Sequence, residues 1–389
     1  MESRIPNSNN EILEKNNNKI ENFINNNSEN IINNSQEQNQ AYKAIIPITS
    51  FDTSLNLPII KDFKIPIEKI QKLSSIIVKF DKNMENMLEI IRQIKLEIIS
   101  HLDSIVKLLY NNYSTMEIFG SSINGLDIES SDMDLSIQTK SKKPLNIFES
   151  YLYKHNDNGQ YLDIEAKYTA HTPVIKLGIN YLQLNNSKIS ELYKNLTENN
   201  YYKFLVKNKF YNEFEVIKAD ITLNSIKYSQ VKFIENGIKI FPEIKPLMKI
   251  LKKLLANKNI TNSYKGGICS FLVFLLLYSY LKIYRNNYKK NENDFEYGAI
   301  LMGFLAHYAF FVDFRRTSIN PDLENPFVKE DKELSEIPTI IRPLTIENVG
   351  KLIYKIDDVV MGLKDIYKEL FDILKDCDDK KIILKIYNK

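Results

Sequence analysis

The chain has 389 residues, enough for two domains and a tail, and its 52 Lys and Arg against 49 Asp and Glu give a formal charge of +3. This balance neither requires nor excludes nucleic acid as a partner, so a nucleic-acid-binding surface would have to be a local patch. Two cysteines, Cys269 and Cys377, exclude a disulfide framework or a cysteine-based zinc site within the chain, and the four histidines form no metal motif. We therefore expect an intracellular protein, in the nucleus or the cytoplasm.

Residues 1–45 form a low-complexity segment that is rich in asparagine and poor in large apolar side chains. Such a segment buries too little apolar surface to offset the entropy of ordering, so it is predicted to be a disordered tail. Residues 1–40 are polar nearly throughout and lack the apolar core of a signal peptide. The apolar stretch 268–281 is too short and too interrupted for a membrane span, so no membrane association is expected.

Residues 60–110 have the spacing of core helices. A first helix is predicted around 67–78 and a longer one over 87–109, because apolar residues recur three or four positions apart. Further along the chain, the same reasoning predicts helices at 144–154, 246–256, 268–281, 297–313 and 352–374, a strand at 174–179 and a loop at 320–338.

A glycine turn after a short strand forms the first part of a candidate site. Thr115–Phe119 is short and β-prone and predicts a strand. Gly120 permits a sharp turn, Ser121 is placed to cap a short helix, and Gly125 is placed to end that helix. Free N–H groups at the start of a helix bind anions, so Gly120 and Ser121 are predicted to hold phosphate groups.

Two aspartates follow on the next predicted strand. From 131 to 137 apolar and polar residues alternate, which places Asp132 and Asp134 side by side on one face. Adjacent carboxylates repel and raise each other's pKa, whereas Mg²⁺ binds carboxylate oxygens and substrate phosphates together. A polar strand end with two solvated aspartates is the alternative, but the spacing of the whole motif favours a nucleotide and metal site. The motif comprises Gly120, Ser121, Gly125, Ser131, Asp132 and Asp134.

A third carboxylate, Asp220, lies in a further alternating stretch. Between residues 216 and 224 the apolar side chains fall on one face and Asp220 on the other. A surface position on an edge strand is the alternative for a lone aspartate. The presence of the pair Asp132 and Asp134 favours Asp220 as a third catalytic carboxylate.

The string of residues 119–135 resembles the signature of ribonucleotidyltransferases of the DNA polymerase β superfamily. Within it, the chain is most similar to template-independent RNA 3′-end polymerases, namely the TRAMP-type poly(A) polymerases and the terminal uridylyltransferases. The resemblance extends from about residue 65 to about residue 365. It implies an α+β fold, in which N-terminal helices at 60–110 brace two domains. These are a polymerase-β-like nucleotidyltransferase domain at 111–240, with a small mixed sheet and helices, and a mostly helical PAP-associated central domain at 241–380.

The resemblance also implies contacts with the nucleotide. Asn224 matches an asparagine that often follows the third aspartate, and Lys252 matches a lysine that reaches the triphosphate. The alternative for Lys252, with Lys249 and Lys253, is a solvated basic helix face.

Two glycines before an apolar helix match the family as well. By this match Gly267 and Ser270 would contact the nucleotide and Phe271 would stack on its base, while a helix start buried in the core is the alternative. The complete set of implied nucleotide-binding residues is Gly120, Ser121, Ser131, Asn224, Lys252, Gly267, Ser270, Phe271 and Asn348.

Two stretches depart from the family pattern. Residues 181–213 are polar and rich in Asn and Tyr, which predicts an inserted hairpin or loop, and a plain surface insertion is favoured over RNA contact. Residues 342–351 resemble the nucleotide-recognition loop, although Arg342 replaces the usual aspartate. Glu347 stands where uridylyl-specific members tend to carry histidine, just before Asn348, and this favours ATP over UTP.

These features predict attack of an RNA 3′-hydroxyl on the α-phosphate of a nucleoside triphosphate, with release of pyrophosphate. Two Mg²⁺ ions, or Mn²⁺ in their place, would be held by Asp132, Asp134 and Asp220, and Asp220 would help to activate the hydroxyl. The resemblance implies polyadenylation from ATP and a partner protein that binds the RNA. Terminal uridylyl transfer, transfer to a protein or small molecule, and a non-catalytic nucleotide- or RNA-binding role are open alternatives.

Overall fold

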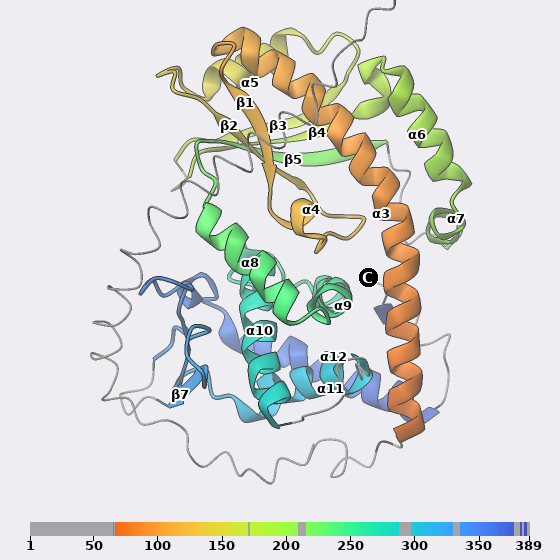
Figure 1. Cartoon of the computed structure of the whole chain (residues 1–389), viewed down its shortest axis with the longest axis vertical. Coiled ribbons are helices and arrows are strands. Elements are labelled where there is room, and N and C mark those ends of the chain that lie inside the picture. The colour runs from red at the N-terminus through yellow and green to blue at the C-terminus, as the bar shows by residue number, and fades with distance from the viewer. Residues whose placement is uncertain are drawn as a thin grey trace, which may run out of the picture.

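The computed structural model describes residue 65 and residues 67–169, 172–208, 215–287, 297–329, 335–376, 382, 385 and 386. The predicted tail, residues 1–45, lies outside the described residues. A five-stranded mixed sheet lies on one side of a group of helices (Figure 1), which confirms the expected α+β class. No helix in these ranges is both long enough and apolar enough to cross a bilayer.

The sheet has the strand order β1-β2-β5-β4-β3, in which only β2 and β5 run parallel to each other. The strands predicted around residues 115–119, 131–137, 174–179 and 216–224 are all present, whereas β3 had not been predicted. Apolar side chains on β2, β4 and β5 are buried on the face that packs against helices. The bounds are β1 Thr115–Phe119, β2 Met133–Gln138, β3 Tyr161–Lys167, β4 Val174–Asn180 and β5 Val216–Leu223.

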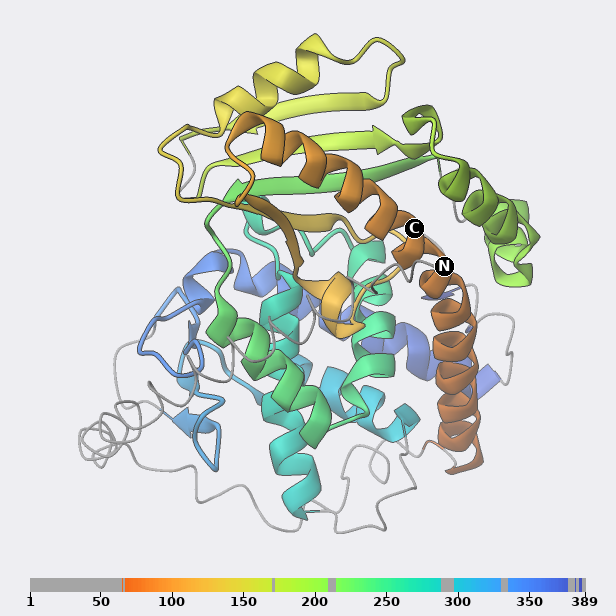
Figure 2. The same cartoon turned by 45° about the horizontal axis from the view of Figure 1, so that its top comes forward.

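One long helix, α3 (Ile67–Leu109), runs beside both the sheet and the helical part of the molecule (Figure 2). It packs against β1, α6, α9 and α11. The prediction of two separate helices was wrong, because Phe80 and Met84 continue the buried stripe through the polar stretch between them. A single helix therefore contacts both the sheet and the helical part of the molecule.

The described part of the inserted segment, residues 181–208, is helical, so the prediction of a hairpin or loop was wrong there; residues 209–213 lie outside the described residues. Two helices, α6 (Ser187–Glu198) and α7 (Asn200–Lys207), follow a short 3₁₀ turn and pack against α3. The side chains of Asn186 and Asn199 accept hydrogen bonds from backbone N–H groups at the two helix starts. The asparagines that suggested a loop are therefore helix caps.

The second part of the molecule is mostly helical. The predicted helices at 246–256, 268–281 and 352–374 are present with somewhat different bounds. The helix predicted at 297–313 ends at residue 306 and continues as a π-helical turn, His307–Phe311. Within the predicted loop at 320–338, residues 327–329 form strand β7 of a small sheet of order β7-β6-β8, and residues 330–334 lie outside the described residues. The helix α8 had not been predicted. The bounds are α8 Tyr228–Ile240, α9 Ile244–Asn257, α10 Ser270–Asn287, α11 Tyr297–Ala306, α12 Ile356–Asp376, β6 Thr317–Ile319, β7 Phe327–Lys329 and β8 Thr339–Ile340.

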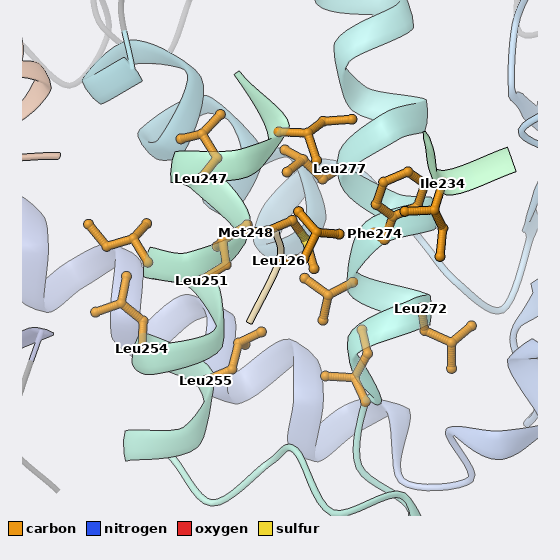
Figure 3. Close-up of a cluster of buried hydrophobic side chains, with 14 of the residues drawn as sticks. Leu126, Ile234, Leu247, Met248, Leu251, Leu254, Leu255, Leu272, Phe274 and Leu277 are labelled. Carbon is orange, nitrogen blue, oxygen red and sulfur yellow. The ribbon is translucent and has the colours of Figure 1, made fainter. Parts of the chain in front are cut away.

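The loop that carries the motif is anchored in the helical core. Leu126 follows the short helix α4 (Ser121–Asn124), and Figure 3 shows it among the buried side chains of α9 and α10. The predicted helix at 144–154 is also present, as α5 (Asn146–Lys154), and packs against strand β3 of the sheet. Apolar packing at Leu126 therefore fixes the motif against a second group of helices.

Truncation of this anchor should destabilise the protein. We expect Leu126→Ala to lower the free energy of unfolding by about 2–5 kcal/mol, because it leaves a cavity between α9 and α10. Urea denaturation measures the change. The control is Ile123→Ala, which truncates an exposed side chain in α4. Equal effects of the two substitutions would show that Leu126 is not an anchor.

Candidate active site

The pairing of β2 with β5 brings two of the predicted catalytic aspartates together. Asp134 on β2 lies directly opposite Asp220 on β5 in the parallel register, and Asp132 precedes β2 by one residue. Met133, Leu135 and Ile137 point the other way and are fully buried. The alternating pattern therefore orients the carboxylates toward the face that the core does not fill.

The three carboxylates are close enough to influence one another. Burial, followed by the negative charges of Asp220 and Asp132, raises the pKa of Asp134 to about 6. Burial and the charge of Asp220 also raise the pKa of Asp132. Two carboxyl groups with raised pKa values beside a third carboxylate form a site that would favour a bound cation.

A lysine lies against the third carboxylate. Lys176 on β4 is opposite Asp220 on β5, and its Nζ donates to both carboxylate oxygens, at 2.7 and 3.0 Å. In the described part of the chain, no three His, Cys, Asp or Glu side chains are arranged as they stand to hold a metal ion. The oxygen donors suit Mg²⁺ chemically, but Asp220 would have to exchange Lys176 for the ion in order to serve as a ligand.

Gly120 is required by the approach of Asp134. Its φ is +75°, and a Cβ at this position would lie 2.1 Å from Oδ2 of Asp134. The helix α4 starts at Ser121, so Gly120 rather than Ser121 occupies the cap position, contrary to the prediction. Gly125 has a φ of 72° and ends the helix as predicted. Any side chain at residue 120 would displace the carboxylate.

The segment between α4 and β2 is held by charged groups on α3. The carboxylate of Asp127 is fully buried and accepts hydrogen bonds from Nε and Nη2 of Arg92, at 3.3 and 2.6 Å. The hydroxyl of Ser131 accepts a bond from the backbone N–H of Ile128, so it stabilises the turn before Asp132. Ser131 therefore has a partner within its own loop.

The basic residues of α9 do not form the solvated face that was considered for them. Lys249 is 1% exposed and its Nζ lies 2.8 Å from Oδ1 of Asp81, while Lys253 pairs with Glu129. Nζ of Lys252 is buried and donates to the carbonyl oxygen of Leu126 at 2.7 Å. Burial lowers the pKa of Lys252 to about 8, against the opposing influence of nearby aspartates that include Asp134.

The start of α10 lies beside the predicted recognition loop. Ser270 is exposed at the first position of the helix, and the guanidinium of Arg342 lies 5.6 Å from the ring centroid of Phe271. Nε of Arg342 donates to Glu347 at 2.7 Å, and Nη1 donates to Gln230 of α8 at 2.6 Å. The two residues that depart from the family pattern therefore form an ion pair, and its Arg342 member lies over the ring of Phe271.

Three other predicted nucleotide-binding residues have structural partners. A Cβ at Gly267 would lie 2.3 Å from the carbonyl oxygen of Ile260, so this glycine allows close backbone packing. The side chain of Asn224 bonds both the N–H and the carbonyl of Thr139, at 2.9 Å each. The remaining residue, Asn348, accepts bonds from the N–H groups of Ile340 and Gly350 and donates to the carbonyl of Pro338. Their roles toward a nucleotide stay predictions.

Sequence reasoning assigned no role in the site to Lys95, Lys176 or Gln230. Lys95 lies in the apolar stripe of α3, between Ile91 and Ile98, and a lysine at such a position is a signal that could have been used. The contacts of Lys176 and Gln230 depend on the pairing of distant segments. A single sequence does not reveal that pairing.

The raised pKa of Asp134 should make stability depend on pH. The unfolded chain releases this proton near the ordinary pKa of 3.8, and the folded protein releases it near 6. The free energy of unfolding should therefore fall as the pH rises from about 4 to about 6. In the presence of a chelator, Asp134→Asn should raise stability at pH 7 by up to about 3 kcal/mol and flatten this profile. Urea denaturation between pH 4 and pH 7 measures this dependence, and the control is Asp157→Asn, at an exposed position. If the free energy of unfolding of Asp134→Asn falls with pH as steeply as that of the unaltered protein, Asp134 is not the group responsible.

Part of the chain is similar in sequence to known RNA polymerases. Residues 73–227 match the family model of the central palm domain of mitochondrial-like poly(A) RNA polymerase. Poly(A) RNA polymerase gld-4 of Caenorhabditis elegans is 27% identical over 109 residues, which are 27% of this chain and 13% of that protein. The inactive non-canonical poly(A) RNA polymerase protein Trf4-2 of Drosophila melanogaster is 24% identical over 187 residues, 45% of this chain and 46% of that protein. The chain thus spans less than half the length of these curated relatives.

Solved structures share the fold. The polymerase core of TRAMP, an RNA surveillance complex, has a TM-score of 0.57 and 18% identity over 75% of this chain and 85% of that one. The Cid1 poly(U) polymerase with Mg 3′-dATP bound has a TM-score of 0.55 and 15% identity over 82% of this chain and 98% of that one. Residues 73–227 are thus similar to the palm domain of poly(A) RNA polymerases, and the described chain shares the fold of the TRAMP and Cid1 polymerase structures.

Proposed function

We propose that this chain is a template-independent RNA 3′-terminal nucleotidyltransferase that adds AMP from ATP. The observation that carries the proposal is the parallel register that sets Asp220 beside Asp134, while Asp132 lies one residue before the start of the same strand as Asp134. A third carboxylate in this position supports phosphoryl transfer at a metal site better than it supports a surface role.

The reaction joins the RNA 3′-oxygen to the α-phosphorus of ATP and breaks the bond from that phosphorus to the oxygen that leaves with pyrophosphate. Two Mg²⁺ ions, when bound by Asp132, Asp134 and Asp220, would supply charge neutralisation and an activated hydroxyl. Asp220 takes the proton of the hydroxyl, directly or through water. The N–H groups at Gly120 and Ser121 orient the outer phosphates.

Lys252 and Lys176 both add positive charge near these carboxylates. The ammonium group of Lys252 is buried and donates a hydrogen bond to the carbonyl oxygen of Leu126. The negative charge of Asp134 attracts it. A buried cation behind the loop attracts the triphosphate without direct contact, because charges interact more strongly where water is excluded. Lys176 holds Asp220 in register until a cation or the reacting hydroxyl replaces it.

The polar groups over Phe271 support ATP as the preferred nucleotide. Arg342 binds Oε2 of Glu347, and no hydrogen bond to Oε1 is present within the described ranges. A carboxylate oxygen accepts hydrogen bonds only, so it matches the exocyclic amino group of adenine and opposes O4 of uracil. Terminal uridylyl transfer is the alternative that this arrangement disfavours.

A second candidate is a non-catalytic nucleotide- or RNA-binding protein with the same fold. Two observations favour it: the relative Trf4-2 is named inactive, and Asp220 is paired with Lys176 rather than aligned with the other aspartates as a metal site.

For the catalytic proposal, we further infer that a separate RNA-binding protein presents the RNA 3′ end. Assays with short unstructured RNA avoid dependence on such a partner.

Loss of the carboxylate of Asp132 or of Asp220 should abolish nucleotide addition. We expect Asp132→Asn and Asp220→Asn to lower the rate of primer extension by at least roughly 100-fold, because each removes a metal ligand. The measurement is extension of a labelled RNA primer with ATP and Mg²⁺, with the exposed Asp157→Asn as control. Absence of extension by the unaltered protein would favour the non-catalytic alternative. Full activity in either variant would remove these residues from the mechanism.

Glu347 should set the preference for the base. We expect the unaltered protein to use ATP better than UTP, and Glu347→Gln to narrow this preference by about tenfold, since the amide can donate to uracil. Extension of the same primer with each of the four triphosphates, offered separately, measures the ratio. The control is Glu165→Gln on β3, an exposed residue of the sheet. Equal or better use of UTP by the unaltered protein would refute the ATP preference.

A further inference from the structure

We propose that Lys95 is a positioning residue that ties the phosphate-binding part of the site to its carboxylate part. The phosphate arm is residues 120–125, and the carboxylate arm is residues 131–134. The inference rests on the proposed function for what each arm does. The contact that joins the two arms is a property of the structure itself.

The geometry places one ammonium group between the two arms. Lys95 is 2% exposed in the middle of α3. Its Nζ donates to Oγ of Ser122 in α4 at 3.2 Å and to the carbonyl oxygen of Ser131 at 3.1 Å. That carbonyl belongs to the peptide group whose nitrogen is the backbone nitrogen of Asp132. A shift of the ammonium therefore passes directly to the first catalytic carboxylate.

Lys95 is also unusual in its surroundings. Nothing in the described part of the chain forms an ion pair with it, and a buried ammonium without such a partner is unfavourable unless other groups compensate. The negative charges of Asp127, Asp132 and Asp134 favour its charged form, against the effect of burial and of Arg92. Burial of the Lys95 ammonium group is unfavourable, and the negative charges of the nearby aspartates offset part of that cost. A role in the candidate site therefore explains this lysine better than a role in packing.

The neighbouring Arg92 has a different task. One turn earlier on α3, Arg92 holds Asp127 in the interior of the loop. Lys95 instead contacts the two ends of the loop, where the proposed phosphate and metal groups lie. Loss of Lys95 should therefore change the spacing of the arms while Arg92, Lys252 and Leu126 keep the loop in place.

Lys95→Met tests the inference, because it keeps the length and removes the charge and the donors. Replacement of a buried charge by an apolar group is often neutral for stability, so we expect a folded protein. In protein without nucleotide and metal, hydrogen exchange of residues 120–134 should become faster while the rest of α3 is unchanged. In the extension assay, kcat should fall roughly 10- to 100-fold with a smaller change in KM. The matched control is Lys107→Met, an exposed lysine on the same helix.

Ser122→Ala provides a second variant that removes one partner and keeps the lysine. Alone, it should change exchange and kcat in the same direction by a smaller factor. Combined with Lys95→Met, it should add nothing, because the contact is already lost. Additive effects of the two substitutions, unchanged exchange and kcat in Lys95→Met, or faster exchange along the whole of α3 would each overturn the inference. If the unaltered protein extends no RNA, the proposed function fails, and the exchange of residues 120–134 still decides whether Lys95 joins the arms.

Discussion

Repulsion among three carboxylates is the constraint on which this structure depends. The parallel pairing of β2 and β5 fixes Asp134 and Asp220 opposite each other, and Asp132 adds a third negative charge. Burial, together with this repulsion, raises the pKa values of Asp132 and Asp134. The proposed ligand, a divalent cation with a polyphosphate, would relieve this repulsion, because such a cation binds carboxylate and phosphate oxygens together.

Lysine side chains and closely packed backbone surround these negatively charged carboxylates. Lys176 binds Asp220 directly, while the buried Lys95 and Lys252 donate hydrogen bonds to carbonyl oxygens of residues 126 and 131. Gly120 lets the backbone lie against the carboxylate of Asp134, where a methyl group would not fit. Each of these groups comes from a different element, so the site is assembled by contacts between the sheet, α3 and α9 rather than by one loop. That assembly gives α3 a role beyond filling the core.

Much of the fold could be predicted from the sequence where the signal is local. Alternation identified the strands around Asp134 and Asp220, and the two glycines located the turn and the end of α4. The inserted helices were missed because Asn186 and Asn199 are loop formers by composition, and their capping role appears only with the helices they start.

The part of the site that could not be predicted depends on contacts between distant residues. Nothing in the sequence pairs Lys176 with Asp220, or Arg342 with Glu347 and Phe271. The Lys176–Asp220 contact bears on the choice between a catalytic and a non-catalytic role, and the contacts of Arg342 bear on the choice between ATP and UTP.

One measurement tests the central claim most directly: the anomalous scattering of Mn²⁺ in crystals of the protein with a non-hydrolysable ATP analogue. The account predicts Mn²⁺ bound by oxygens of Asp132, Asp134 and Asp220, with Lys176 no longer on Asp220. Nucleotide bound without Mn²⁺ at these carboxylates, or an unchanged pair between Lys176 and Asp220, would contradict it.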